Sequence, residues 1–124
     1  MTKQQAFNKI WKTFVTNGAP QCLSKSASCS YGGLNQAGCA VGCLLHKKDR
    51  IEAFAWEREG IVGNTSIGPL KRKFPNIKSY LPVEGGFLKR MQEWHDNDMT
   101  PIIQERKEQL RKIAKAYKLT APAK

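Results

Sequence analysis

The sequence predicts one α+β domain that is predominantly helical and carries a small β-hairpin or irregular knot near residues 22–38. The 124 residues suit a single domain over residues 1–124. Apolar residues recur every three or four positions in several segments, which is the period of a helix. Between residues 19 and 38 this period stops and Ser, Gly, Asn and Pro dominate, which indicates irregular chain or a short hairpin.

The first predicted helix spans about residues 3–16. Thr2 and Gln5 form a capping-box pattern, with a hydroxyl at the cap and an amide three residues later. Asn17 and Gly18 are typical of a helix end. Four residues on one face are expected to form core rather than a stacking surface: Phe7, Ile10, Trp11 and Phe14.

The segment from Cys29 to Leu45 combines cysteines with glycines. Cys29–Tyr31 is interpreted as a short strand of the hairpin. Residues 39–45 are mostly apolar and predict a short buried helix. Gly42 inside that helix costs about 1 kcal/mol relative to alanine, which indicates close packing against another backbone.

The middle of the chain predicts a second amphipathic helix and then connecting structure. Asp49 is a suitable cap for the helix, and Gly60 ends it. Residues 61–86 contain repeated Gly and Pro, so we expect at most short helical turns there.

Two helices are predicted in the last third of the chain. Helical spacing returns at Phe87 and continues to His95-Asp96. Thr100 followed by Pro101 predicts the start of the last helix, about residues 101–118, with Arg106 among its outward-facing basic residues. Residues 119–124 are expected to form a frayed tail.

The chain is strongly basic, with 21 Lys+Arg against 10 Asp+Glu and a net charge of +11. Such an excess favours an anionic macromolecule, either nucleic acid or an acidic protein face, as partner. No apolar run approaches the roughly 20 residues of a membrane span, so no membrane partner is expected. The N-terminal segment lacks the apolar core of a signal peptide, which predicts a cytoplasmic protein with reduced cysteines.

The candidate contacts to nucleic acid lie in three basic clusters, of which the last helix is one. Cations beside an aromatic ring suit phosphate contact combined with base stacking. No zinc-finger spacing, RNP motif or helix-turn-helix is visible, so binding would be directed to the backbone and sensitive to salt. The candidate residues of the other two clusters are Lys47, Lys48, Arg50, Lys71, Arg72, Lys73, Lys78 and Tyr80.

A metal site is an alternative role for the four cysteines, Cys22, Cys29, Cys39 and Cys43. Structural zinc sites usually show paired ligands two to four residues apart, and only Cys39 and Cys43 fit that spacing. The simpler interpretation is that these two cysteines are small buried hydrophobic residues. No cofactor is predicted.

Nucleophilic catalysis needs a thiol, a base and a group that orients the base. Cys39, His95 and Asp96 are the candidates. Adjacent residues on an α-helix point about 100° apart, so His95 and Asp96 are not expected to form a dyad by themselves. The sequence therefore favours no enzyme class, and for His95 a helix-capping role is the simpler alternative.

Cys29-x-Tyr31 and the block Gly38-Cys-Ala-Val-Gly-Cys-Leu-Leu45 resemble the C-x-Y…C-A-[IV]-G-C-L-I signature of small uncharacterised phage and prophage proteins. A weaker similarity continues at Leu88-x3-Gln92-x2-His95-Asp96. The resemblance implies a phage or mobile-element origin and action in the bacterial host cytoplasm, and it implies no particular chemistry.

Three functional hypotheses follow. The first is a phage-type accessory protein that binds a host or phage macromolecule through its basic surface. The second is a small-ligand-binding protein or a cysteine/histidine enzyme with a pocket at Cys39 and His95, which requires the cysteine block and the His95 turn to converge. The third is a zinc-stabilised interaction module.

Overall fold

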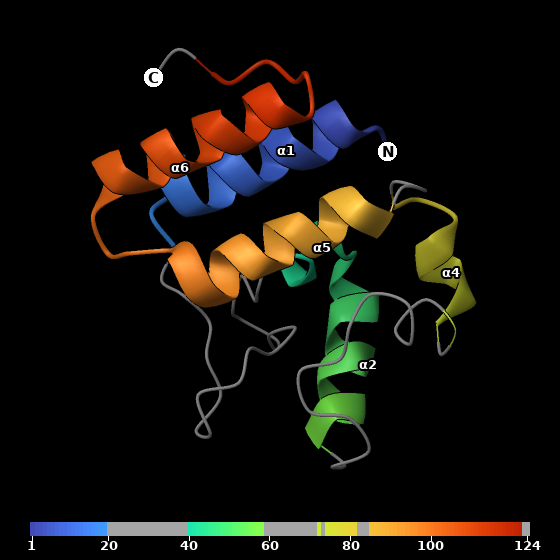
Figure 1. The fold of residues 1–124 in the computed structure, drawn as a ribbon. Coiled ribbons are helices and arrows are strands. Elements are labelled where there is room, and N and C mark those ends of the chain that lie inside the picture. Colours follow the sequence, from blue (N-terminus) through green and yellow to red (C-terminus); the bar gives the residue numbers. More distant parts are fainter. Residues whose placement is uncertain (20–39, 59–71, 73, 82–84, 123–124) are drawn as a thin grey trace.

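The computed structural model describes residues 1–19, 40–58, 72, 74–81 and 85–122. In this part of the chain, α1 and α6 lie side by side, and α5 runs beneath α1 (Figure 1). A fourth helix, α2, leads away from this group (Figure 1). The elements are α1 (Lys3–Trp11), the π-helical turn η1 (Lys12–Thr16), the 3₁₀ turn η2 (Gly42–Leu44), α2 (Lys47–Arg58), α4 (Pro75–Lys78), α5 (Gly85–Glu93), the π-helical turn η3 (Trp94–Asp98) and α6 (Ile103–Ala116).

The predicted α+β class is wrong for the described residues, which form helices and turns and contain no strand. The physical reason is that the apolar faces of the helices are buried against one another, so no sheet is needed to cover them. The hairpin predicted at residues 22–38 lies outside the described residues. None of the described helices combines the length and the apolar content that crossing a membrane requires.

The first helix begins and buries its side chains as the sequence predicts. The Thr2 hydroxyl accepts a hydrogen bond from the Gln5 amide, and the Gln5 side chain accepts one from the Thr2 amide. The helix widens into η1 and ends at Gly18, whose φ of 65° suits glycine. The predicted stripe is buried: Phe7, Ile10, Trp11 and Phe14.

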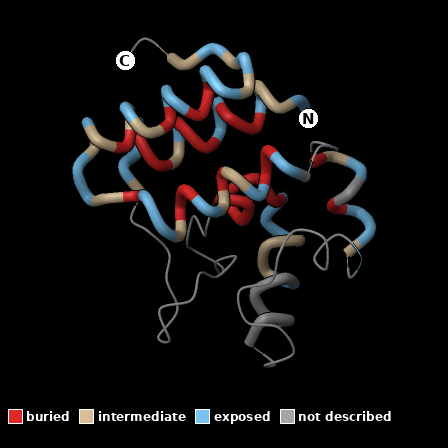
Figure 2. The backbone as a smooth tube through the Cα atoms, viewed as in Figure 1, coloured by how far each residue is buried: buried red, intermediate tan, exposed pale blue. Residues whose placement is uncertain are grey.

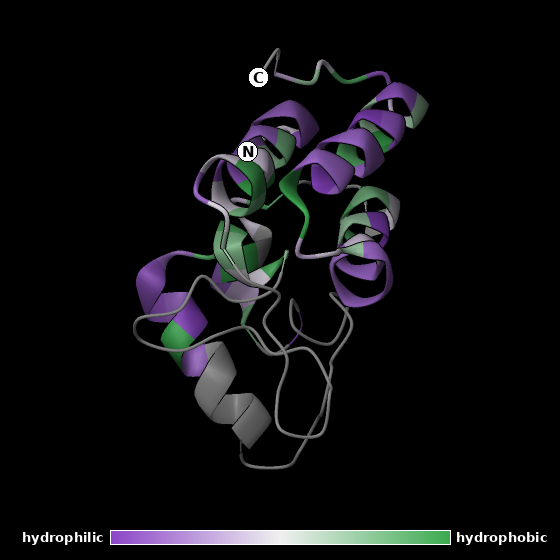
Figure 3. Ribbon diagram, turned by 90° about the vertical axis from the view of Figure 1, so that its left-hand side faces the viewer, coloured by the Kyte–Doolittle hydropathy of each residue, from purple (hydrophilic) through white to green (hydrophobic). Residues whose placement is uncertain are grey.

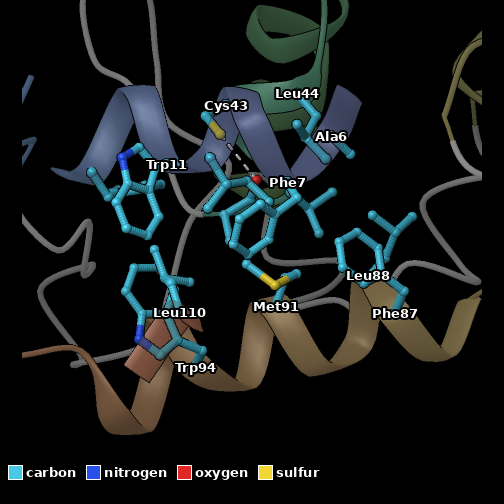
Figure 4. Packing of buried hydrophobic residues seen from close by; sticks show 14 of the residues in the cluster. Ala6, Phe7, Trp11, Cys43, Leu44, Phe87, Leu88, Met91, Trp94 and Leu110 are labelled. Carbon is cyan, nitrogen blue, oxygen red and sulfur yellow. Dashed lines mark hydrogen bonds between the residues drawn. The ribbon is translucent and has the colours of Figure 1, made fainter. Parts of the chain in front are cut away.

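The core lies where α1, α5 and α6 meet, and the buried residues face this centre from each helix (Figure 2). Figure 4 shows Leu88 and Met91 of α5 and Trp94 of η3 opposite Phe7 and Trp11 of α1. The indole of Trp94 also packs edge-on against Phe14, with ring centroids 5.9 Å apart. Aromatic packing of this kind fixes α5 against α1.

The segment predicted as a short buried helix at residues 39–45 forms a shorter structure. Residues 40 and 41 make a turn, and η2 contributes a single 3₁₀ turn before the chain extends at Leu45. The segment is nevertheless buried, and Cys43 and Leu44 lie beside Ala6 and Phe7 of α1 (Figure 4). The Cys43 thiol donates to the Ala40 carbonyl at 3.1 Å, so Cys43 is a buried free cysteine of the core.

The last helix begins two residues later than predicted. Thr100 does not cap it; its hydroxyl accepts a hydrogen bond from the Ile102 amide, and the helix starts at Ile103. Arg106, predicted to face outward, is buried at 4% exposure. Its guanidinium donates to the carbonyls of Phe14, Ala19 and Thr100 at 2.6–2.8 Å, and burial lowers the pKa of Arg106 below its ordinary value.

Candidate functional site

The basic positions predicted to bind an anionic partner are only partly described. Lys47 and Lys48 are exposed in the first turn of α2, and Arg72 is exposed beside α4. Lys78 belongs to α4, and only the backbone of this residue is described. Lys71 and Lys73 lie outside the described residues.

Arg50 is half-buried and differs from the exposed lysines before it. Its Nε is buried and has no hydrogen-bond partner among the described residues. Part of its guanidinium is therefore withdrawn from solvent, and Arg50 offers less of its charge to a partner than Lys47 and Lys48 do.

Tyr80 is half-buried in a polar cluster with His46 and Asp49. His46 directly precedes α2, and Asp49 lies in its first turn. The imidazole of His46 stacks on the phenol ring, with centroids 3.8 Å apart and an interplanar angle of 11°. The Tyr80 hydroxyl donates to Asp49 Oδ2 at 2.7 Å and accepts from the His46 amide at 3.2 Å. Burial and the bond to Asp49 both raise the pKa of Tyr80.

This cluster also touches the start of the chain, because the Met1 amino group donates to the Tyr80 carbonyl. The sequence prediction named Tyr80 and missed His46 and Asp49 as its partners. Asp49 was predicted to cap α2, and it lies instead inside the first helical turn and binds Tyr80. No local pattern links positions that are 31 and 34 residues apart.

A second basic surface is formed by α1 and α6, which run antiparallel and side by side (Figure 1). At one end Gln4 exchanges two hydrogen bonds with Thr120, and at the other Arg106 binds Phe14. Figure 3 shows hydrophilic residues along the outer sides of both helices. We call this the α1–α6 surface, and its exposed cations are Lys9, Lys12, Arg111, Lys112 and Lys115, with Lys118 just beyond the helix.

Among the described residues, the lysines of the α1–α6 surface have no carboxylate within 4.0 Å. Among the described residues, ion pairs within 4.0 Å join His46 to Asp49, Arg90 to Asp98 and His95 to Asp96, and none involves these lysines. Glu108 and Lys112 lie one helical turn apart on α6, but their charged groups do not come within that distance. Arg111 lies over the Trp11 ring, 5.7 Å from its centroid, and is partly engaged in packing.

Two of the candidate catalytic residues, His95 and Asp96, lie in η3, directly after α5, and Cys39 lies outside the described residues. His95 Nδ1 lies 3.1 Å from Asp96 Oδ1, so these neighbours do contact each other, contrary to the prediction. The reason is the π-helical turn η3, whose wider winding brings adjacent side chains closer in rotation than an α-helix does. Asp96 also accepts from Gln92 at 2.9 Å, and Gln92 in turn accepts from the Val41 amide at 3.1 Å.

This chain of contacts ties the end of the cysteine block to the His95 turn. Through its contact with Nδ1, Asp96 orients the imidazole of His95. The ring itself is fully buried and packs edge-on against Phe14 at 5.4 Å. The arrangement is that of a polar core network around a buried imidazole.

The described residues provide no candidate metal site. No group of three histidine, cysteine or acidic side chains among them is placed as metal ligands would be. Cys22, Cys29 and Cys39 lie outside the described residues, so the four-cysteine site stays a prediction.

Comparison of the chain with family models, with curated proteins and with solved structures finds no match.

Proposed function

We propose that the protein is a small phage-type accessory protein of the bacterial cytoplasm that binds nucleic acid through the α1–α6 surface. The observation that carries this proposal is the set of exposed lysines on two neighbouring helices without a carboxylate within ion-pair distance among the described residues. Positive charge that is not neutralised within the protein is available to phosphates.

The distribution of charge along the chain supports the same surface. The first 48 residues contain no Asp or Glu, so every charged side chain of α1 is positive. In α6 the acidic residues are Glu105 and Glu108, and they are outnumbered by lysine and arginine. Neutralising phosphates with such a surface releases condensed counterions, which drives binding without a sequence-reading motif.

Fluorescence anisotropy with a labelled 20-base-pair duplex, titrated at salt concentrations from 50 to 300 mM, tests the proposal. We expect the affinity to fall steeply as the salt concentration rises. The slope of the logarithm of the binding constant against the logarithm of the salt concentration should be about −0.9 for each phosphate contact. The double variant K112Q/K115Q should weaken binding and reduce the slope by about 1 to 2. K89Q is the matched control, because Lys89 is an exposed lysine on α5.

Two results would contradict the proposal. One is the absence of binding to DNA and RNA at 50 mM salt, after which an acidic protein face would be the partner that the charge favours. The other is an equal loss of affinity in K112Q/K115Q and in K89Q, which would show that the nucleic acid does not bind at the α1–α6 surface.

The contacts between Val41, Gln92, Asp96 and His95 favour a second candidate, a reactive thiol at Cys39. They link Val41, two residues after Cys39 in the sequence, to the turn that carries His95, whose imidazole would serve as the base. The test is the rate of iodoacetamide alkylation of Cys39 between pH 5 and 9, mapped by mass spectrometry. A Cys39 that still reacts at pH 6, and about tenfold more slowly in H95Q, would support this candidate. An ordinary thiol profile in both proteins would exclude it.

A further inference from the structure

The stack of His46 on Tyr80 is rigidly held and faces solvent on one side. Tyr80 is fixed at its hydroxyl by Asp49 and by the His46 amide, and at its carbonyl by the Met1 amino group. The two rings are nearly parallel, at 11°, and 3.8 Å apart. The His46 side chain is 66% exposed although one of its faces is covered by the phenol ring. The opposite face of the imidazole is therefore open.

Exposed cations stand next to this open ring. Lys47 and Lys48 follow His46 directly and are both exposed. The acidic neighbour, Asp49, is only 14% exposed and is engaged with Tyr80, so it presents little negative charge to a ligand. An open ring face flanked by lysines is the combination that proteins use to bind single-stranded nucleic acid, by stacking a base and pairing its phosphates.

The stack also lies at the same end of α1 as the last turn of α6. Met1 contacts Tyr80, and Gln4, one helical turn later, bonds to Thr120 just after α6. The start of α1 therefore contacts both the Tyr80 backbone and the segment that follows α6.

We infer that His46, backed by Tyr80, is a stacking platform for an unpaired base of single-stranded nucleic acid, with Lys47 and Lys48 contacting the adjacent phosphates. This inference rests on the proposed function and narrows it. In a duplex the base faces are already stacked on each other, so the platform gives a preference for single strands. Duplex binding uses the α1–α6 surface alone.

Anisotropy with a labelled 12-nucleotide oligothymidylate and a 12-base-pair duplex tests the platform in the full-length protein. H46A should weaken binding of the single strand about tenfold, the scale of one lost base–aromatic stack, and leave duplex binding unchanged. H46F keeps a flat ring and should retain most of the single-strand affinity. Thermal unfolding of each variant confirms that the protein titrated is folded, and K89Q serves again as the control.

The outcomes separate this inference from the proposed function. Equal weakening of single-strand and duplex binding by H46A, or no effect on either, would overturn the platform while the α1–α6 proposal stands. Failure of H46F to retain single-strand binding while folded would also overturn it, because the stack would then not be what is recognised. If the wild-type protein binds neither oligonucleotide at 50 mM salt, both ideas are wrong.

Discussion

Replacing Arg106 with methionine should destabilise the protein by about 3 kcal/mol. The guanidinium satisfies the buried carbonyl of Phe14, one of the last carbonyls of the first helix, and the part-buried carbonyls of Ala19 and Thr100. Losing the donor to the buried carbonyl costs about 2 kcal/mol, and the two carbonyls that water can reach cost about 1 kcal/mol each. Methionine is uncharged, so the variant does not have to bury a charge on folding, and this offsets about 1 kcal/mol of the total.

The assay is urea unfolding followed by tryptophan fluorescence, since Trp11 and Trp94 are both buried. A loss of about 3 kcal/mol corresponds to a fall in Tm of about 12 °C for a chain of this size. R111M is the matched control: Arg111 is exposed and lies over Trp11, and its loss should cost under about 1 kcal/mol. A stability of R106M within 1 kcal/mol of wild type, with an unchanged m-value, would refute this account of Arg106.

Three smaller effects should also be measurable. Lys118 has a φ of 57°, a conformation that glycine adopts without strain, so K118G should add about 1 kcal/mol of stability and K118Q should add none. Because burial raises the pKa of Tyr80, the folded protein keeps its phenol proton above pH 10, where the unfolded chain loses it. Stability should therefore fall as the pH rises above about 10, and Y80F should remove part of that fall whereas Y117F should keep it. Q92A cuts the hydrogen bond that holds the 40–45 turn, so the buried thiol of Cys43 should react faster with Ellman's reagent in native protein; an unchanged rate would contradict the tether.

Much of the helical structure could be predicted from sequence because it depends on neighbouring residues. The capping box of Thr2 and Gln5 acts over three positions, and the buried stripe of the first helix follows the helical period. Even Arg106 carried a usable signal. It lies in register with the apolar residues Ile103, Leu110 and Ile113 of α6, so the helical spacing favours burial of Arg106 whereas its charge favours exposure.

The parts that were missed depend on contacts between distant positions or on departures from α-helical winding. Arg106 and the Phe14 carbonyl are separated by 92 positions, and Val41 and Gln92 by 51. The contact of His95 with Asp96 is local, but it requires the π-helical turn, and the sequence was interpreted with the angular spacing of an α-helix.

The same structure changes what the net charge of +11 means for binding. Arg106 uses its charge to hold three carbonyls, Arg50 is half-buried, and Arg111 packs over an indole. Since a buried or packed guanidinium is a poor partner for a phosphate, the described arginines on these helices contribute more to the fold than to a polyanion. Binding should therefore depend mainly on lysines, and the salt dependence should reflect the exposed lysines rather than the formal charge. The slope of log binding constant against log salt concentration counts the phosphate contacts. If that count approached the net charge of +11, the polyanion would have to contact residues outside the α1–α6 surface and the His46 platform.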